Sequence, residues 1–144
     1  MAPSGFILAA LVVFLALFLS TAWLVKRGPV SRMTDGPVFC GLCHPMAFEV
    51  TSYLSSAHAS GGVSCNSCHL PHSLLYGTLG KAYTGIKDIA SFTLGRAPAP
   101  LLATAWTRRT IRENCLSCHK QVMSGIKTEG LDCLRCHRRI AHGQ

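Results

Sequence analysis

The spacing Cys-x-x-Cys-His occurs four times in this chain of 144 residues, and the four copies use all eight cysteines. Two thiols at this spacing are the attachment signal for a c-type haem, and the adjacent imidazole is placed to reach the iron. The sequence therefore predicts four covalently bound c-type haems in a protein that moves electrons. The motifs are Cys40, Cys43 and His44; Cys65, Cys68 and His69; Cys115, Cys118 and His119; and Cys133, Cys136 and His137.

Zinc sites and disulfide bonds are the two alternative uses of these cysteines. Paired Cys-x-x-Cys units can hold zinc, but zinc does not require a histidine directly after the second cysteine. A disulfide framework would also use an even number of cysteines, and it leaves the four histidines unexplained. Covalent haem accounts for both residue types.

The iron ligands raise a counting problem. Only His58, His72 and His142 lie outside the motifs, so three histidines face four sixth coordination positions. At least one haem must be five-coordinate, or bind an unusual ligand, or take a ligand from another chain. Met46 follows the first motif and is a candidate, because methionine is a known haem ligand, although a lone methionine is more often a core residue.

The N-terminal segment predicts a membrane anchor. Residues 6–25 carry no charge, and a helix of this length spans about 30 Å, the thickness of a bilayer hydrocarbon core. Trp23 suits the interface, and Lys26 and Arg27 end the run. A cleaved signal peptide is the alternative, but the run is long for one and no basic residues precede it. We expect an uncleaved single span.

The orientation follows from the haems. The positive-inside rule would place Lys26 and Arg27 in the cytoplasm. However, haem c is attached on the outer face of the bacterial inner membrane. We therefore expect a cytoplasmic N-terminus with anchor at 1–27, a linker at 28–39 marked by two Gly-Pro pairs, and a periplasmic tetrahaem domain at 40–144. The formal net charge of +8 is roughly cancelled by about eight haem propionates, so no nucleic-acid partner is expected.

The haem domain is expected to be mostly α-helical and irregular, with short helices and loops around the haems. Thr110 to Glu113 has the spacing of a capping box and predicts a helix start, and Ser64 and Asp132 are expected N-caps. Residues 95–100 predict a loop. No stretch alternates as a strand, and haem faces are expected to replace an ordinary core.

The order of these features resembles the NapC/NirT family of membrane-anchored tetrahaem quinol dehydrogenases, and most closely its short type, the membrane subunit of cytochrome c nitrite reductase. An anchor precedes Cys-x-x-Cys-His-x-Met, three further motifs and a C-terminal histidine. Further matching segments are His58-Ala-Ser, 64–72, Lys81-Ala82, Asp88, Thr93-Leu-Gly, Asn114-Cys115, and Cys136-His137 followed by His142.

The resemblance implies a ligand set. Met46 binds the first iron in place of His44, with Asp88 on the distal side of that iron. The motif histidines His69, His119 and His137 bind the second, third and fourth irons. His142 and His58 are the distal ligands of the second and third haems, and the partner reductase supplies a lysine to the fourth. The role of His72 stays open, with a structural one expected.

A quinol site is also implied. Lys81 matches a lysine of the family's quinol pocket, and Asp88 follows two helical turns later, so both can share one face. An ammonium can stabilise a quinol oxygen as it becomes negative, and a carboxylate can accept a proton. A solvated lysine and aspartate on an amphipathic helix is the ordinary alternative.

We expect a menaquinol or ubiquinol dehydrogenase that feeds a periplasmic multihaem reductase, with nitrite reductase as the leading partner in a hetero-oligomer. The alternatives are a quinone reductase running in the reverse direction, a tethered electron shuttle without a quinol site, and a small-molecule reductase with an open haem.

Overall fold

The computed structural model describes residues 3–98 and 101–142, and within them it is helical with no strand. This confirms the predicted fold class. In chain order the elements are α1 (Pro3–Lys26), α2 (Pro29–Thr34), α3 (Pro37–Cys40), the 3-10 turn η1 (His44–Met46), α4 (Ala47–Leu54), α5 (Ala57–Ser60), α6 (Cys65–His69), α7 (Leu74–Thr93), α8 (Ala105–Cys118) and α9 (Cys133–Cys136).

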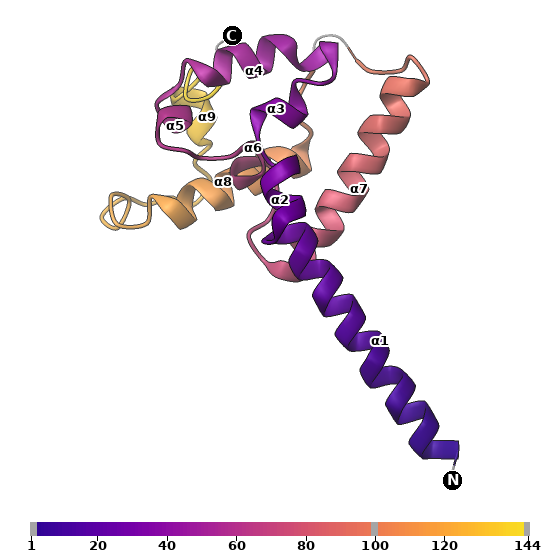
Figure 1. Ribbon diagram of the computed structural model, residues 1–144. Helices are drawn as coiled ribbons and strands as arrows, with labels where there is room; N and C mark the ends of the chain where they lie inside the picture. The colour runs from indigo at the N-terminus through magenta and orange to yellow at the C-terminus, as the bar shows by residue number, and fades with distance from the viewer. Residues whose placement is uncertain (1–2, 99–100, 143–144) are drawn as a thin grey trace.

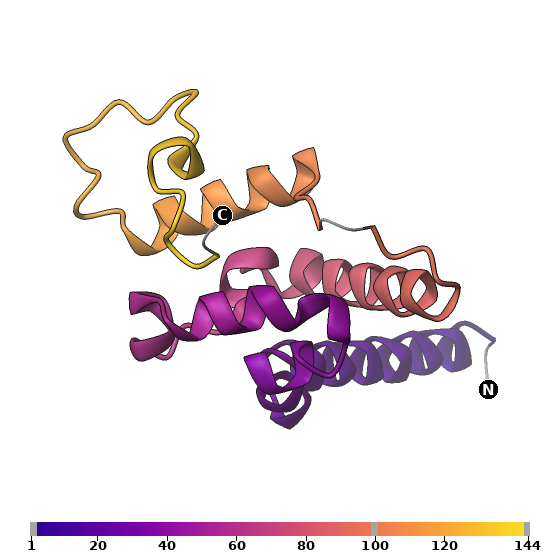
Figure 2. The same ribbon diagram turned by 90° about the horizontal axis from the view of Figure 1, so that it is seen from above.

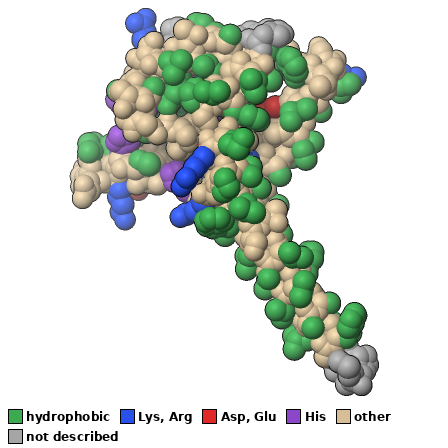
Figure 3. Space-filling model, in the orientation of Figure 1, with side chains coloured by type: hydrophobic (Ala, Val, Ile, Leu, Met, Phe, Trp, Pro, Cys, Tyr) green, Lys and Arg blue, Asp and Glu red, His purple; other side chains and the backbone are tan. Residues whose placement is uncertain are grey.

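The N-terminal part of α1 projects away from the other helices as a single rod (Figure 1). Its apolar side chains lie exposed along its length (Figure 3). Among the described residues, Gly5–Thr34 is the one helical stretch long and apolar enough to cross a membrane. Only 6% of its most apolar 18-residue segment is buried. A core helix of a soluble protein would be mostly buried, so α1 fits a membrane-spanning helix instead.

The residues predicted to form the linker, 28–39, are largely helical. Both Gly-Pro pairs break the helix as predicted. Each proline then starts a new short helix, Pro29 in α2 and Pro37 in α3. The first helical position suits proline, because its missing N–H would have no partner there and its φ is already helical. The anchor is thus joined to the haem motifs by two short helices rather than by an extended segment.

The expected helix ends are partly confirmed. Ser64 and Asp132 cap α6 and α9 with their side-chain oxygens. The capping box at Thr110 is wrong, because α8 begins at Ala105, where Thr104 accepts a backbone N–H. Thr104 lies six residues earlier and offers the same cap chemistry, so Thr110 is left inside the helix.

The long helix α7 lies beside the C-terminal part of α1 (Figures 1 and 2). The hydroxyl of Thr78 donates to the carbonyl of Ala22 at 3.4 Å. Helix α7 ends at Thr93, and Gly95 follows with φ of +63°, a conformation that favours glycine. Residues 95–98 form the predicted loop, while 99–100 lie outside the described residues.

Candidate functional site: paired histidines and a lysine–aspartate pair at the end of the anchor helix

The cysteines are arranged to hold haems. None of the eight forms a disulfide, and each is half-buried or exposed. In the second, third and fourth motifs the two cysteines lie within one helix, three residues apart, so both thiols lie on the same face. One flat group can therefore reach both thiols of a motif.

Two pairs of histidines meet across the haem domain. The ring centres of His58 and His119 lie 6.2 Å apart, and those of His69 and His142 lie 6.0 Å apart. Imidazoles that bind one metal ion from opposite sides, with bonds of about 2.0–2.1 Å, have ring centres roughly 6 Å apart. Each pair joins a motif histidine to one from outside the motifs.

The outer histidines are held in the tautomer that a metal ligand needs. The Nδ1–H of His58 donates to the carbonyl of Ile140 at 3.3 Å, and the Nδ1–H of His142 donates to the carbonyl of Glu49 at 3.0 Å. The carboxylate of Glu49 also lies 3.3 Å from His142 Nδ1. Carbonyls only accept, so Nδ1 carries the proton and the lone pair of Nε2 is left for a metal.

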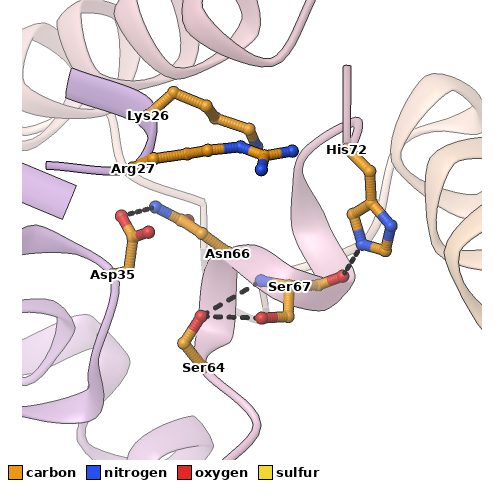
Figure 4. A pocket seen from close by; sticks show the side chains of 7 residues that line it. All are labelled: Lys26, Arg27, Asp35, Ser64, Asn66, Ser67 and His72. Carbon is orange, nitrogen blue, oxygen red and sulfur yellow. Dashed lines mark hydrogen bonds between the residues drawn. The ribbon is translucent and has the colours of Figure 1, made fainter. Parts of the chain in front are cut away.

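His72 is arranged differently. Its Nε2–H donates to the carbonyl of Ser67 at 2.9 Å (Figure 4), and its Nδ1 lies 3.2 Å from the hydroxyl of Ser117. Both ring nitrogens are therefore occupied by protein groups. His72 joins the turn after α6 to the end of α8, which is a structural task.

Among the described side chains, neither the first nor the fourth motif shows such a histidine pair. Met46 lies half-buried at the end of η1, and the side chain of His44 lies outside the described residues. The choice between them as iron ligand stays a prediction. His137 is exposed just after α9, and no described histidine pairs with it. The exposed side chain of His137 is therefore accessible to another molecule.

The packing fits bound haems. Among the described residues only Ala22, Tyr53 and Leu70 are buried apolar residues, while many large apolar side chains outside α1 are exposed. Three residues cannot form the core of a domain of this size. Porphyrins lying between the short helices would cover those side chains, and once bound they would supply one-electron transfer. The cysteines, the histidine pairs and the missing core all fit covalent haem.

A second cluster lies where the anchor meets α7. The Lys81 ammonium forms an ion pair with Asp35 and donates to the carbonyl of Val25 at 3.1 Å. The Asp35 carboxylate also accepts hydrogen bonds from the Ser31 hydroxyl and, at 2.7 Å, from the Asn66 amide. The side chains of Lys81 and Asp35 are only 15% and 19% exposed, so solvent screens this pair weakly.

Asp35 was not among the residues that the sequence predicted for this site. It is the first acidic residue in the chain, and it follows the span by nine residues, which is the one signal that could have identified it. Asp88, the expected partner, lies on α7 with Lys81 but is 69% exposed and 3.5 Å from Lys87. The structure therefore joins Lys81 to Asp35 and leaves Asp88 facing solvent.

The surroundings of Asp35 set its protonation. Burial alone would raise the pKa of the Asp35 carboxyl, but hydrogen bonds from Lys81, Ser31 and Asn66, with the charge of Lys81, hold that pKa below its ordinary value. The carboxylate is thus ionised at neutral pH. It also lines a cavity of about 270 Å³ at the end of α1, together with Lys26, Arg27, Ser64, Asn66, Ser67 and His72 (Figure 4).

This lowered pKa predicts a pH-dependent stability. The folded state binds the Asp35 proton less tightly than the unfolded state, so the stabilisation is fully present above the ordinary pKa of 3.8 and is lost as pH falls through the folded pKa. Asp35→Asn should therefore lower Tm at pH 7 and have a smaller effect at pH 3. Thermal melts of the detergent-purified protein at both pH values test this, and an equal shift at both would contradict it.

Comparison with known proteins places the chain in a family. A model of the N-terminal region of the NapC/NirT cytochrome c family matches residues 2–144. The chain belongs to the NapC/NirT cytochrome c family. Membership of this family confirms the predicted resemblance, and it makes the chain a c-type cytochrome that acts in electron transfer.

Two family members are similar over most of this chain. One is cytochrome c nitrite reductase subunit NrfH of Nitratidesulfovibrio vulgaris Hildenborough, 34% identical over 115 residues that cover 77% of this chain and 70% of the relative. The other is cytochrome c-type protein NrfH of Wolinella succinogenes, 31% identical over 120 residues that cover 82% and 67%.

A solved structure of the family also matches. It is a chain from the crystal structure of the cytochrome c nitrite reductase NrfHA complex bound to the inhibitor HQNO, with a TM-score of 0.75 and 29% identity. The match covers 96% of this chain and 90% of that one. The likeness therefore extends over both the anchor and the haem domain.

Proposed function

We propose that this chain is a membrane-anchored quinol dehydrogenase. It oxidises menaquinol or ubiquinol and passes the electrons through four c-type haems to a periplasmic multihaem reductase, with cytochrome c nitrite reductase as the partner in a hetero-oligomer. The observation that carries the proposal is the half-buried Lys81 ammonium at the backbone of Val25, the last residue of the apolar run. A lipid-soluble quinol reaches that depth, and the two NrfH relatives support the choice of partner.

The residues of the site divide the chemistry between them. An ammonium has three N–H donors, and Lys81 uses two of them on Val25 and Asp35. The third can hold a quinol oxygen and stabilise the negative charge that develops on it as electrons leave. Asp88 lies two turns further along α7 and is exposed, so a proton that it accepts can pass to water.

The proposed haem ligands follow the pairs described above. His69 with His142 holds the second iron, and His119 with His58 holds the third, as the ring spacings support. Met46 binds the first iron. His137 binds the fourth, whose distal ligand comes from the partner. The covalent attachment residues are Cys40, Cys43, Cys65, Cys68, Cys115, Cys118, Cys133 and Cys136.

The proposed topology is a single span in the bacterial inner membrane. Residues 1–27 form the cytoplasmic end and the anchor, residues 28–39 connect it, and residues 40–144 form the periplasmic haem domain. The contact of Lys81 with Val25, near the end of α1, supports this division, because a quinol site there would lie at the membrane surface.

Four covalent haems are the first expected result. Mass spectrometry of the denatured chain should give a mass roughly 2.5 kDa above the polypeptide, equal to about four haems. Covalent bonds survive denaturation, so loosely bound cofactors do not interfere. The bare polypeptide mass, or zinc in metal analysis, would contradict the haem assignment.

The fourth haem is the proposed exit to the partner. Arg135, Arg138 and Arg139 are exposed around His137. If they dock an acidic partner surface, Arg138→Glu should slow association with the reductase several-fold at low salt, with less difference at high salt. Surface plasmon resonance at two salt concentrations measures this. Unchanged association at low salt would mean that these arginines only neutralise propionates.

A further inference from the structure

We propose that Asp35 is the positioning residue that holds the Lys81 ammonium at the quinol site. This inference rests on the proposed function and adds a residue to it. Asp35 and Lys81 are 46 residues apart in the chain and come from different elements, the turn after α2 and the middle of α7. Their ion pair is therefore made by the tertiary fold and not by a local helix contact.

The Asp35 carboxylate is itself held in place. Ser31, one turn earlier and only 8% exposed, donates to Oδ2, and Asn66 of α6 donates to Oδ1 at 2.7 Å. Both oxygens are thus engaged from two sides before the lysine is counted. A carboxylate with both oxygens bound cannot rotate freely. The position of the Asp35 carboxylate is therefore fixed by α2 and α6, which carry Ser31 and Asn66.

The fixed Asp35 carboxylate in turn restrains the Lys81 side chain, which is flexible on its own. Lysine has a flexible stem of four carbons, and an unrestrained ammonium would sample many positions. The contacts with Asp35 and Val25 fix two of the three donors of Lys81, and the direction of the third follows from them. The donor for the quinol oxygen is therefore oriented before the substrate arrives, which is where an enzyme gains from preorganisation.

Asp35 also balances the positive charge around Lys81. Lys26 lies close enough to Lys81 for the two ammonium groups to repel, and Arg27 lines the cavity that Lys26 and Asp35 also line. Asp35 is the only acidic residue that lines this cavity among the described residues. Without its charge the lysines would face one another with no counter-ion, and the Lys81 side chain would move away from Lys26.

The same contacts do not favour Asp35 as the proton acceptor of the reaction. A carboxylate that receives three hydrogen bonds is stabilised in its charged form and takes up a proton reluctantly. Asp35 is also largely shielded from water, whereas Asp88 is exposed. Asp35 therefore acts through Lys81, and Asp88 remains the proposed acceptor.

The test uses the full-length, haem-loaded protein in detergent and HQNO as the probe. Asp35→Asn keeps the size of the side chain but removes its charge. It is expected to weaken HQNO binding, measured by fluorescence titration, and to lower kcat/KM for a menaquinol analogue, each by about 10- to 100-fold. Asp35→Glu should restore part of both. Glu113→Gln, the same change in an exposed ion pair with Arg109, is the matched control and should leave both unchanged.

A double-mutant cycle separates positioning from a general structural role. In the Lys81→Ala background, Asp35→Asn should cause no further loss of HQNO affinity, because the group that it positions is gone. A further loss of the same size would mean that Asp35 only pins the anchor to α6, and would overturn the inference. Normal HQNO binding by Asp35→Asn, where Lys81→Ala alone has lost it, would overturn the inference and leave the proposed function standing.

Two further outcomes of these experiments have their own interpretation or their own replacement variant. If Lys81→Ala binds HQNO and oxidises quinol normally, the proposed quinol site itself is wrong. If Asp35→Asn does not assemble its haems, Ser31→Ala takes its place, because it loosens the carboxylate and keeps the charge. Ser31→Ala should then weaken HQNO binding a few-fold, and unchanged binding by both Ser31→Ala and Asp35→Glu would overturn the inference.

Discussion

Lys81→Ala is expected to lower the rate of quinol oxidation by about 100- to 1,000-fold, by analogy with the loss of one oxyanion donor. The variant removes the ammonium that donates to the carbonyl of Val25 and still has a third N–H for the substrate. As electrons leave, the quinol oxygen would become negative without the Lys81 ammonium to stabilise it. The measurement is stopped-flow reduction of the haems by a menaquinol analogue under anaerobic conditions.

The haems themselves should not change in this variant. The hydrogen bonds of Lys81 go to Val25 and Asp35, neither of which is proposed to attach haem or bind iron, so all four haems should still be reduced by dithionite. Lys127→Ala is the matched control, because Lys127 is exposed and distant from α7 in the sequence. A normal rate in Lys81→Ala would mean that this lysine serves only to hold the anchor against α7.

Met46→Leu is expected to have the second largest effect, on the potential of one haem. Thioether ligation raises a haem potential relative to two histidines, and leucine keeps the bulk but cannot bind iron. In a redox titration one of the four haems should shift by on the order of 100 mV, within the range of about 0.8 V that axial ligands span. Quinol oxidation should slow, because the first electron acceptor is altered.

Two further variants define what the result means. His44→Ala should leave the ligation of the first iron intact if Met46 is the ligand. Met33→Leu is the matched control for loss of a thioether, because Met33 is an exposed residue of α2. A potential shift in His44→Ala, with none in Met46→Leu, would assign the iron to the motif histidine.

The parts of the structure that depend on local spacing could be predicted from the sequence. The apolar run is the helix α1, and Ser64 and Asp132 cap the helices that follow them. The helix start predicted at Thr110 is wrong for a local reason too, because Thr104 offers an equivalent cap six residues earlier and the helix begins there. Where two caps compete, spacing alone does not choose between them.

The Lys81–Asp35 pair could not be predicted, because it depends on tertiary packing. It forms only when α7 lies against the end of α1 and when α2 is a helix rather than an extended linker. A helix rises 1.5 Å per residue, whereas an extended chain rises more than twice as far, so an extended 28–39 would have put Asp35 elsewhere. Asp88, which the resemblance and the shared helix face indicated, lies on the same helix as Lys81 but is exposed to solvent.

Anaerobic reduction of the purified protein by a menaquinol analogue tests the central claim most directly. The visible spectrum should show reduced c-type haem within seconds of quinol addition, and HQNO should block the reduction. Dithionite, added afterwards, should reduce the remaining haems. Haems that dithionite reduces, but that quinol leaves oxidised with or without the partner reductase, would contradict a quinol dehydrogenase and indicate a tethered electron shuttle.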